Sequence, residues 1–478
     1  MLIGRRREAE ILASALQSDK SEFVAVFGRR RVGKTFLVQE AFGNRFSFVH
    51  TGVAKGGMKK QLAEFRYSVS RISRRKVPAL SDWPSAFHAL QEALEALPRG
   101  KKVVFIDEMP WMDTPRSGFV SALEHFWNGW ANFRKDVLLV VCGSATSWIV
   151  DKVINDHGGL HNRVTRRIRV NPFTLAECEE MVRAENLRLD RRQILEGYMV
   201  MGGIPFYWDR IRKGETMAQA VDRLFVAKDA EFADEFDRLY ASLFRKPEPY
   251  VAVVEALAER RGGKTREELL RDTGAEDNGA FSKVLKELEE CGFVAKYRLP
   301  GRLTRESTYQ LVDNYTLFHF KFLADSAART KSSAPGYWQR TSESQTGRIW
   351  CGFAFERVCF AHVEQMKRAL GISGVVADVY AWRHRAEGAG DRGAQVDLVI
   401  DRRDGVVNLC EMKYSKGPFA ISADYAKRLV ERAETFLASR RGDATVFLTL
   451  VTPAGVKDNE HAGTVQAQIT LDDLFRDA

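Results

Sequence analysis

Apolar runs alternate with amphipathic segments over the first third of the chain. Strand-forming runs predict strands at 23–27, 45–50, 103–106 and 137–142. Between these runs, apolar residues at helical spacing predict helices at 8–16, 36–42 and 83–90. Two of the strands, 103–106 and 137–142, are apolar throughout, which is typical of strands buried on both faces of a parallel sheet. This alternation predicts an α/β fold, and residues 172–240 then continue as helices.

The pattern changes near residue 250 to short helices followed by two strands. Helices are predicted at 251–257, 265–270 and 278–292, and strands at 293–299 and 307–312. The basic loop 300–305 joins the two strands, so this order of elements predicts a winged helix whose wing is that loop.

A long apolar helix at 348–370 opens the last segment, and two apolar strands follow it. Arg403-Asp404-Gly405 suits a three-residue hairpin loop with Gly405 in the left-handed conformation. That loop pairs Arg402 with Val406, and it therefore places Asp397 opposite Glu411. A helix from about 422 and a strand at 444–451 come after the hairpin. We expect three domains, at 1–240, 241–330 and 341–478.

The strand at 23–27 runs directly into Gly-x-x-x-x-Gly-Lys-Thr, and a helix follows. Strand, loop and helix are the context that a phosphate-binding loop requires. The glycines let backbone N–H groups surround phosphates, Lys34 carries a cation to the β- and γ-phosphates, and the Thr35 hydroxyl can hold Mg²⁺. The residues predicted to contact ATP here are Gly28, Arg29, Arg30, Arg31, Val32, Gly33, Lys34 and Thr35.

Two neighbouring carboxylates follow the buried strand 103–106. Such charges are costly at a strand end unless a cation lies there, and Mg²⁺ bound to a nucleotide supplies one. Asp107 would hold the metal through a water, and Glu108 would polarise the attacking water. Ser144, after the strand 137–142, would contact the γ-phosphate or that water; capping the next helix is the alternative.

These segments resemble the AAA+-like and STAND-like P-loop ATPases, in particular a prokaryotic family with many archaeal members. The resemblance covers the phosphate loop, the Asp107-Glu108-Met109-Pro110-Trp111 box, Gly143-Ser144 and the segment 202–207. It implies a helical lid at 172–240, which the Gly202-Gly203 turn could hinge. It also implies an arginine that contacts the γ-phosphate, in cis or from a neighbouring subunit. Arg163 stands at that place, although His161 and Asn162 depart from the family pattern, and a surface arginine is the alternative.

The predicted hairpin opposes two carboxylates, which repel each other unless a cation joins them. Asp397 and Glu411 therefore form a candidate site for Mg²⁺ or Mn²⁺, with Lys413 on the same face of the hairpin. This set resembles the PD-(D/E)xK nuclease superfamily, which implies a further acidic residue on the preceding helix. Glu356 fits that position, and Lys427 stands where the superfamily often has another polar residue. A salt-bridged hairpin, or a nuclease-like fold used only for binding, is the alternative.

Charge and composition add a nucleic-acid partner to this picture. The 478 residues include 73 Lys and Arg against 63 Asp and Glu, a formal net charge of +10, which favours a polyanion, although a solvated basic surface also explains it. Lys283, Lys286, Arg302 and Arg305 are the candidate DNA contacts of the winged helix; a lid or protein contact is the alternative. Without a membrane segment or paired cysteine spacing, we expect a cytoplasmic protein with reduced cysteines and no membrane partner.

The sequence thus predicts an ATP-hydrolysing protein that acts on DNA. ATP with Mg²⁺ is its expected cofactor, and Mn²⁺ is a second candidate for the nuclease-like site. Nucleotide state would control access to that site, and the chain is a possible homo-oligomer. The alternative is an ATP-switched module that binds DNA or protein and carries an inactive nuclease fold.

Overall fold

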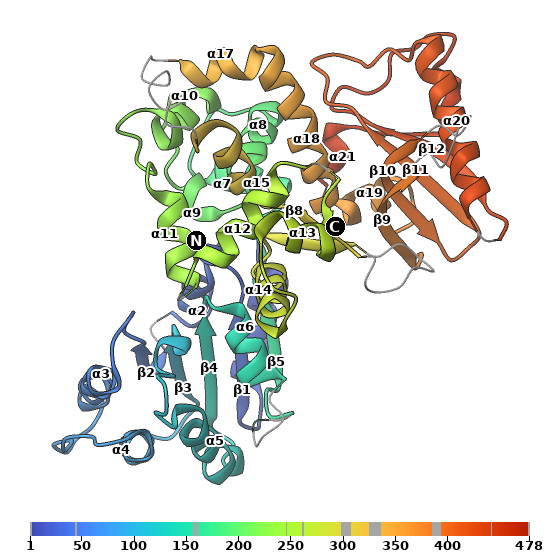
Figure 1. The fold of residues 1–478 in the computed structure, drawn as a ribbon. Helices are drawn as coiled ribbons and strands as arrows, with labels where there is room; N and C mark the ends of the chain where they lie inside the picture. The colour runs from blue at the N-terminus through green and yellow to red at the C-terminus, as the bar shows by residue number, and fades with distance from the viewer. Residues whose placement is uncertain are drawn as a thin grey trace. The chain divides into compact units, whose positions relative to one another are not determined.

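The computed structural model describes residues 2–43, 45–155, 160, 162–244, 246–260, 262–297, 307–324, 336–384, 393–440 and 442–476 (Figure 1). The chain separates into two compact units. The first contains residues 1–172 and 242–245, and the second contains residues 173–241 and 246–478. We expected the helices after residue 172 to belong to the first domain, whereas in the structure they pack within the second unit.

The first unit is built on a five-stranded parallel sheet in the order β2-β3-β4-β1-β5. Its strands are β1 (Glu22–Phe27), β2 (Phe46–Thr51), β3 (Lys102–Asp107), β4 (Val137–Gly143) and β5 (Arg166–Arg169). β3 and β4 are buried along their whole lengths, as their uninterrupted apolar runs predicted. Since β1 lies between β4 and β5, the loop that follows β1 is near the middle of the sheet's carboxyl edge.

The three helices predicted in the first unit, at 8–16, 36–42 and 83–90, are present and are each longer than their predicted bounds. The α-helices are α1 (Arg6–Gln17), α2 (Lys34–Phe42), α3 (Met58–Ser70), α4 (Trp83–Glu95), α5 (Phe119–Gly129) and α6 (Thr146–Ile149). Asp82 caps α4 with a capping box through Ser85. Aromatic side chains from α3, α4 and α5 form the core beside the sheet, where the rings of Trp83 and Phe119 meet edge to face at 4.8 Å.

The second unit starts with short helices. They are α7 (Leu175–Ala184), α8 (Arg191–Met201), α9 (Pro205–Trp208), α10 (Met217–Val221) and α11 (Glu235–Leu243). The predicted glycine turn lies between α8 and α9. Gly202 has a positive φ of 62°, and a Cβ on Gly203 would lie 1.9 Å from the carbonyl oxygen of Phe173. Only glycine fits this close approach of two backbone segments.

The middle segment, from Glu248 to Leu311, contains three helices and a small antiparallel sheet among its described residues. They are α12 (Glu248–Ala258), α13 (Arg266–Thr273), α14 (Gly279–Glu290), β6 (Lys264–Thr265), β7 (Val294–Tyr297) and β8 (Thr308–Leu311). The sheet order is β6-β8-β7. A capping box between Thr265 and Glu268 begins α13, and Gly274 in the left-handed conformation ends it. The predicted wing, 300–305, lies outside the described residues.

Further helices connect the small sheet to the last part of the chain. They are α15 (Asn314–Phe318), α17 (Tyr337–Glu343), α18 (Gln345–Ala361) and α19 (Val363–Ala369). We predicted one helix over 348–370, and this was wrong because the helix is interrupted at His362. That residue has φ −118° and ψ 30°, and its Nε2 accepts a hydrogen bond from the backbone N–H of Leu175 at 2.9 Å. The side chain therefore caps the first turn of α7.

A second five-stranded sheet, in the order β13-β12-β11-β10-β9, completes the unit. Its strands are β9 (Ala377–His384), β10 (Ala394–Arg402), β11 (Val406–Met412), β12 (Thr445–Val451) and β13 (Ala467–Ile469), and α20 (Ala423–Ser439) joins β11 to β12. The predicted hairpin register is confirmed by the pairs from Leu398 with Cys410 to Asp401 with Val407. Gly405 has the expected positive φ, 82°.

All six cysteines are free and buried, as expected for reduced core residues. Among the helices that the structure describes, none has both the length and the apolar character that a membrane crossing requires.

Burial of His50 on β2 predicts an acid-sensitive first unit. Burial lowers the pKa of His50 from 6.5 to about 4, and its Nε2 has no hydrogen-bond partner. On acidification, His50 therefore takes up a proton at a higher pH in the unfolded chain than in the folded protein. The free energy of unfolding is at its full value above pH 6.5 and falls between pH 6.5 and pH 4. A shift of this size corresponds to about 3 kcal/mol.

We expect His50→Phe to reduce the loss of unfolding free energy on acidification by up to about 3 kcal/mol. Urea unfolding from pH 7.5 to pH 4 measures this loss. The matched control is His88→Phe, because His88 is exposed on α4. If His50→Phe and the wild type lost the same unfolding free energy, His50 would not be the acid-sensitive group.

Candidate functional site

The phosphate loop lies between β1 and α2, as predicted. A Cβ on Gly28 would lie 2.2 Å from the carbonyl oxygen of Val170, and its φ is 146°, so a side chain is excluded there. Gly33 has φ 86° and is the N-cap of α2. The buried Lys34 Nζ donates to the carbonyl oxygens of Gly28 at 2.9 Å and Arg29 at 2.8 Å. The lysine is thus held over the loop that would receive the phosphates.

A chain of hydrogen bonds links the loop to the two strand-end carboxylates. Thr35 Oγ1 donates to Asp107 Oδ2 at 2.7 Å, and Asp107 Oδ1 accepts from the Glu108 N–H at 2.8 Å. Glu108 has a left-handed backbone, with φ 46° and ψ 43°. Its carboxylate accepts from both the hydroxyl and the N–H of Ser144. The structure therefore brings Thr35, Asp107, Glu108 and Ser144 together.

This contact decides between the two roles considered for Ser144. The next helix, α6, has Ala145 as its N-cap and receives no side-chain cap, so the capping alternative is wrong. Ser144 instead contacts the carboxylate of Glu108, and its role at the γ-phosphate or the attacking water stays a prediction.

Two arginines of the first unit, Arg163 and Arg5, have different surroundings in the structure. Arg163 is exposed, and its N–H donates to the carbonyl oxygen of Leu160 at 3.0 Å; a role at the γ-phosphate stays a prediction. Arg5, which the sequence did not single out, is buried, and its guanidinium donates to the carbonyl oxygens of Val32 at 3.3 Å and Asn171 at 2.5 Å. Arg5 thus links the phosphate loop, through Val32, to the segment after β5, through Asn171. Arg5 is the first of three consecutive arginines, and the sequence pattern did not distinguish it from the other two.

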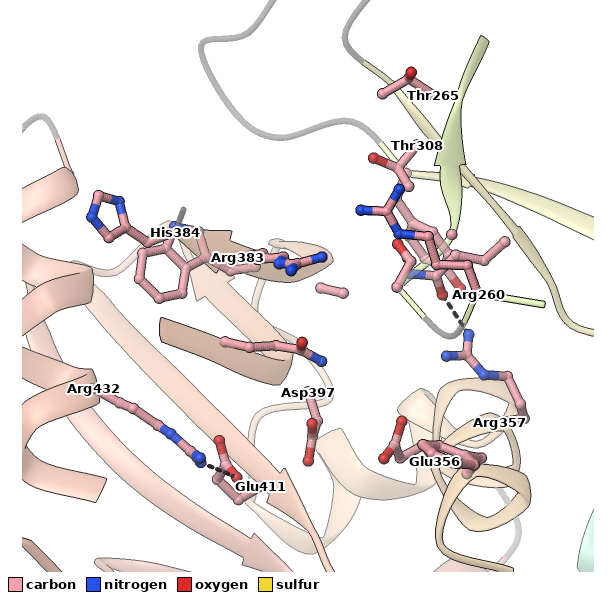
Figure 2. A pocket seen from close by; sticks show the side chains of 18 of the residues that line it. Arg260, Thr265, Thr308, Glu356, Arg357, Arg383, His384, Asp397, Glu411 and Arg432 are labelled. Carbon is pink, nitrogen blue, oxygen red and sulfur yellow. Dashed lines mark hydrogen bonds and ion pairs between the residues drawn. The ribbon is translucent and has the colours of Figure 1, made fainter. Parts of the chain in front are cut away.

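The second cluster lies on β10 and β11. Lys413 Nζ is 3.9 Å from Asp397 Oδ2 and 3.6 Å from Glu411 Oε2, so the hairpin brings these three residues together as predicted. Asp397 Oδ2 also accepts from the Met412 N–H at 3.0 Å. Figure 2 shows the carboxylates of Glu411, Asp397 and Glu356 in one row, with Glu356 projecting from α18. The predicted helix residue thus lines the same cavity.

Glu411 is the most buried member of this cluster, with 3% of its surface exposed. Burial and the neighbouring Asp397 raise the pKa of Glu411, whereas Arg432 and Lys413 oppose that change. Arg432 Nη1 donates to Glu411 Oε2 at 2.6 Å, and the Tyr425 hydroxyl is 3.4 Å from the same oxygen. The other oxygen, Oε1, is buried without a hydrogen-bond partner.

Sequence reasoning missed Arg432 and Tyr425 and considered Lys427 instead. Lys427 is largely exposed and lies 4.0 Å from Glu431. On α20, residues 425, 429 and 432 follow helical spacing, so Tyr425 and Arg432 lie on the face that the buried Leu429 marks. That periodicity was the signal that could have identified Arg432.

The donor set around Glu411 fits a divalent cation in one respect. An unpartnered buried carboxylate oxygen beside a second carboxylate is the hard oxygen environment that Mg²⁺ or Mn²⁺ takes. In the described parts of the chain, no group of three or more His, Cys, Asp or Glu side chains is close enough to hold a metal ion. Any metal here would therefore rest on Asp397 and Glu411, the two predicted ligands, with water completing its coordination.

In the middle segment, the candidate DNA-binding helix is α14. Lys283 and Lys286 are exposed on it and lie 3.9 Å from Glu287 and 3.7 Å from Glu290. Arg302 and Arg305 lie outside the described residues. Contact of this helix with DNA stays a prediction.

Comparison with known proteins supports the first part of this picture. Residues 2–209 match the family described as an ATPase domain predominantly from Archaea. A protein of Methanocaldococcus jannaschii, described as uncharacterized, is 22% identical over 417 residues, which are 87% of this chain and 88% of that protein. A Walker-type ATPase of Pyrococcus abyssi is similar in structure, with a TM-score of 0.50 and 19% identity, over 67% of this chain and 96% of that one.

The family match covers the phosphate loop and the strand-end residues described above, and the structural similarity shows a shared fold. Residues 2–209 are therefore similar in sequence to an ATPase domain found predominantly in Archaea, and the chain shares the fold of a Walker-type ATPase.

Proposed function

We propose that this protein is an ATP-dependent enzyme that acts on DNA and cleaves it at the Asp397–Glu411–Lys413 cluster. Its winged-helix segment would bind DNA, and ATP hydrolysis in the first unit would control the second. The observation that carries the proposal is that Asp397, Glu411, Lys413 and Glu356 line one cavity. They come from two strands and a helix, as the resemblance to PD-(D/E)xK nucleases implies.

In the first unit, each residue has a role that its contacts support. Lys34 would exchange its bonds to loop carbonyls for the β- and γ-phosphates of ATP. Thr35 and Asp107, already hydrogen-bonded to each other, would hold Mg²⁺ directly and through water. Glu108, oriented by Ser144, would accept the proton of the attacking water.

In the second unit, Asp397 and Glu411 would hold Mg²⁺ or Mn²⁺, which supplies Lewis-acid stabilisation of a phosphodiester. The Lys413 ammonium lies beside both carboxylates and would stabilise the negative charge that develops on the scissile phosphate. Glu356 would accept a proton from a water that it orients in the same cavity. The buried Glu411 needs a cation near it in every state, and Arg432 and Lys413 supply that charge within the chain.

The ion pair of Glu411 with Arg432 favours a second candidate function. A carboxylate already neutralised by an arginine can be purely structural, and the cavity would then bind nucleic acid or protein without cleaving it. ATP would switch that binding. The two functions differ in one measurable property, metal-dependent cleavage.

Lys34→Ala and Glu108→Gln should separate ATP binding from hydrolysis. Lys34→Ala removes the phosphate-binding cation, so we expect loss of both fluorescent-nucleotide binding and phosphate release. Glu108→Gln keeps the contact with Ser144 but not the base, so binding should persist while kcat falls at least about 100-fold. Lys59→Ala, at an exposed position of α3, is the matched control. Wild-type turnover in Glu108→Gln would refute the role of Glu108.

Glu411→Gln should abolish DNA cleavage. We expect cleavage of supercoiled, linear or single-stranded DNA with Mg²⁺ or Mn²⁺ to fall at least about 100-fold, because the substitution removes a charged metal ligand. Binding of Mn²⁺, followed by electron paramagnetic resonance, should weaken in parallel. Each substrate is tested with and without ATP, and in the Lys34→Ala background, to show whether ATP controls the site.

The control for this experiment is Glu434→Gln, an exposed carboxamide substitution on α20 that should leave cleavage unchanged. No cleavage by the wild type under any condition, with ATP hydrolysis intact, would favour the binding module. Cleavage that survives Glu411→Gln would place the active site elsewhere.

A further inference from the structure

The cavity that contains the carboxylates is shared by the middle segment and the last sheet. Its volume is about 620 Å³, the size class of small-molecule sites and enough for one or two nucleotides, but not for a section of double helix. The wall opposite the carboxylates comes from the small sheet and its preceding turn. The residues contributed there are Arg260, Gly262, Gly263, Thr265, Glu268, Tyr297, Thr308 and Gln310.

Four arginines line this cavity. Arg357 donates to Gln310 and Arg432 to Glu411, and Arg260 and Arg383 are the other two. Arg260 Nη1 donates to Glu268 Oε1 at 2.6 Å, and Glu268 Oε2 accepts from the Thr265 N–H at 2.8 Å. The capping box of α13 therefore holds Arg260 in the wall. Arg383 extends from β9 toward the same wall, since a Cβ on Gly262 would lie 3.9 Å from its Nη1. Figure 2 shows both arginines on the side of the carboxylates that faces the middle segment.

Two aromatic rings also line the cavity, on the face of β9 opposite to the one from which Arg383 extends. The rings of Trp382 and His384 are nearly parallel, with an interplanar angle of 11° and centroids 6.3 Å apart, and both line the cavity. They point from the same face of β9, because they are two residues apart. Cations that follow a phosphate backbone beside rings that stack on bases are the combination that binds single-stranded nucleic acid.

We propose that this cavity takes a single strand, or the unpaired end of a duplex, with Arg260 and Arg383 on consecutive phosphates and a base on the His384 ring. The inference rests on the proposed function, since it names the substrate form for the same site. The small sheet of the middle segment, rather than its helix α14, then closes over the strand.

The test measures binding of fluorescein-labelled oligonucleotides by anisotropy. The probes are a single strand, a blunt duplex of the same sequence, and that duplex with a single-stranded tail. The binding buffer contains Ca²⁺ in place of Mg²⁺, because carboxylates also bind Ca²⁺. For the variant Arg260→Ala/Arg383→Ala we expect about tenfold weaker binding of the single strand and the tailed duplex. The slope of log affinity against log salt should fall by about 1.4, the value for two phosphates of a single strand.

Binding of the blunt duplex should stay unchanged, since it would use other surfaces. Arg271→Ala is the matched control, because Arg271 is an exposed arginine on α13 of the same segment and does not line the cavity. His384→Ala should weaken single-strand binding while leaving the salt slope unchanged. ATP hydrolysis and thermal unfolding of each variant report whether it is folded.

Equal loss on all three probes, or wild-type affinity of the double variant, would overturn the inference. Failure of this inference can be distinguished from failure of the proposed function. Single-strand binding that depends on Arg260 and Arg383 without any cleavage by the wild type would leave the inference standing and reject the nuclease. Cleavage that needs Glu411 but is indifferent to both arginines would do the reverse.

Discussion

Burial of neighbouring carboxylates is the constraint on which both sites depend. In the last sheet, the register of β10 and β11 opposes Asp397 and Glu411, and Glu411 is almost fully buried. Two carboxylates in such a place are tolerated only with positive charge nearby, which Lys413 and Arg432 provide. One oxygen of Glu411 still lacks a partner. The carboxylates of the cluster are therefore largely compensated within the chain, while one buried oxygen of Glu411 keeps an unused acceptor.

The carboxylates at the end of β3 meet the same constraint with neutral partners. Asp107 and Glu108 accept hydrogen bonds from the hydroxyls of Thr35 and Ser144. Hydroxyl donors stabilise the carboxylates without cancelling their charge, so the pair keeps its attraction for a metal bound to nucleotide. Lys34 is held by loop carbonyls, which a phosphate can replace. The two sites thus differ in how firmly their charges are already compensated.

The parts of the structure that were predictable depend on neighbours in sequence. The glycines of the phosphate loop, the apolar runs of β3 and β4, and the loop Arg403-Asp404-Gly405 each specify local geometry, and the hairpin loop then determines which residues face each other. The break at His362 depends instead on α7, which lies far away in sequence. The wall formed by Arg260 was missed for the same reason, because tertiary packing brings it to the cavity, whereas the helical periodicity of α20 did mark the face that carries Arg432.

Packing within the second unit links the helices after residue 172 to the elements that form this cavity. Residues 173–209 fall within the ATPase family match, yet they pack with the second unit. The first turn of α7 is capped by His362, at the end of the helix that carries Glu356. Glu196 on α8 accepts from the hydroxyl of Tyr414, which follows Lys413. A movement of α7 and α8 relative to the sheet would therefore act on the helix that carries Glu356 and on Tyr414, whereas Asp397, Glu411 and Lys413 are held by backbone bonds of the sheet.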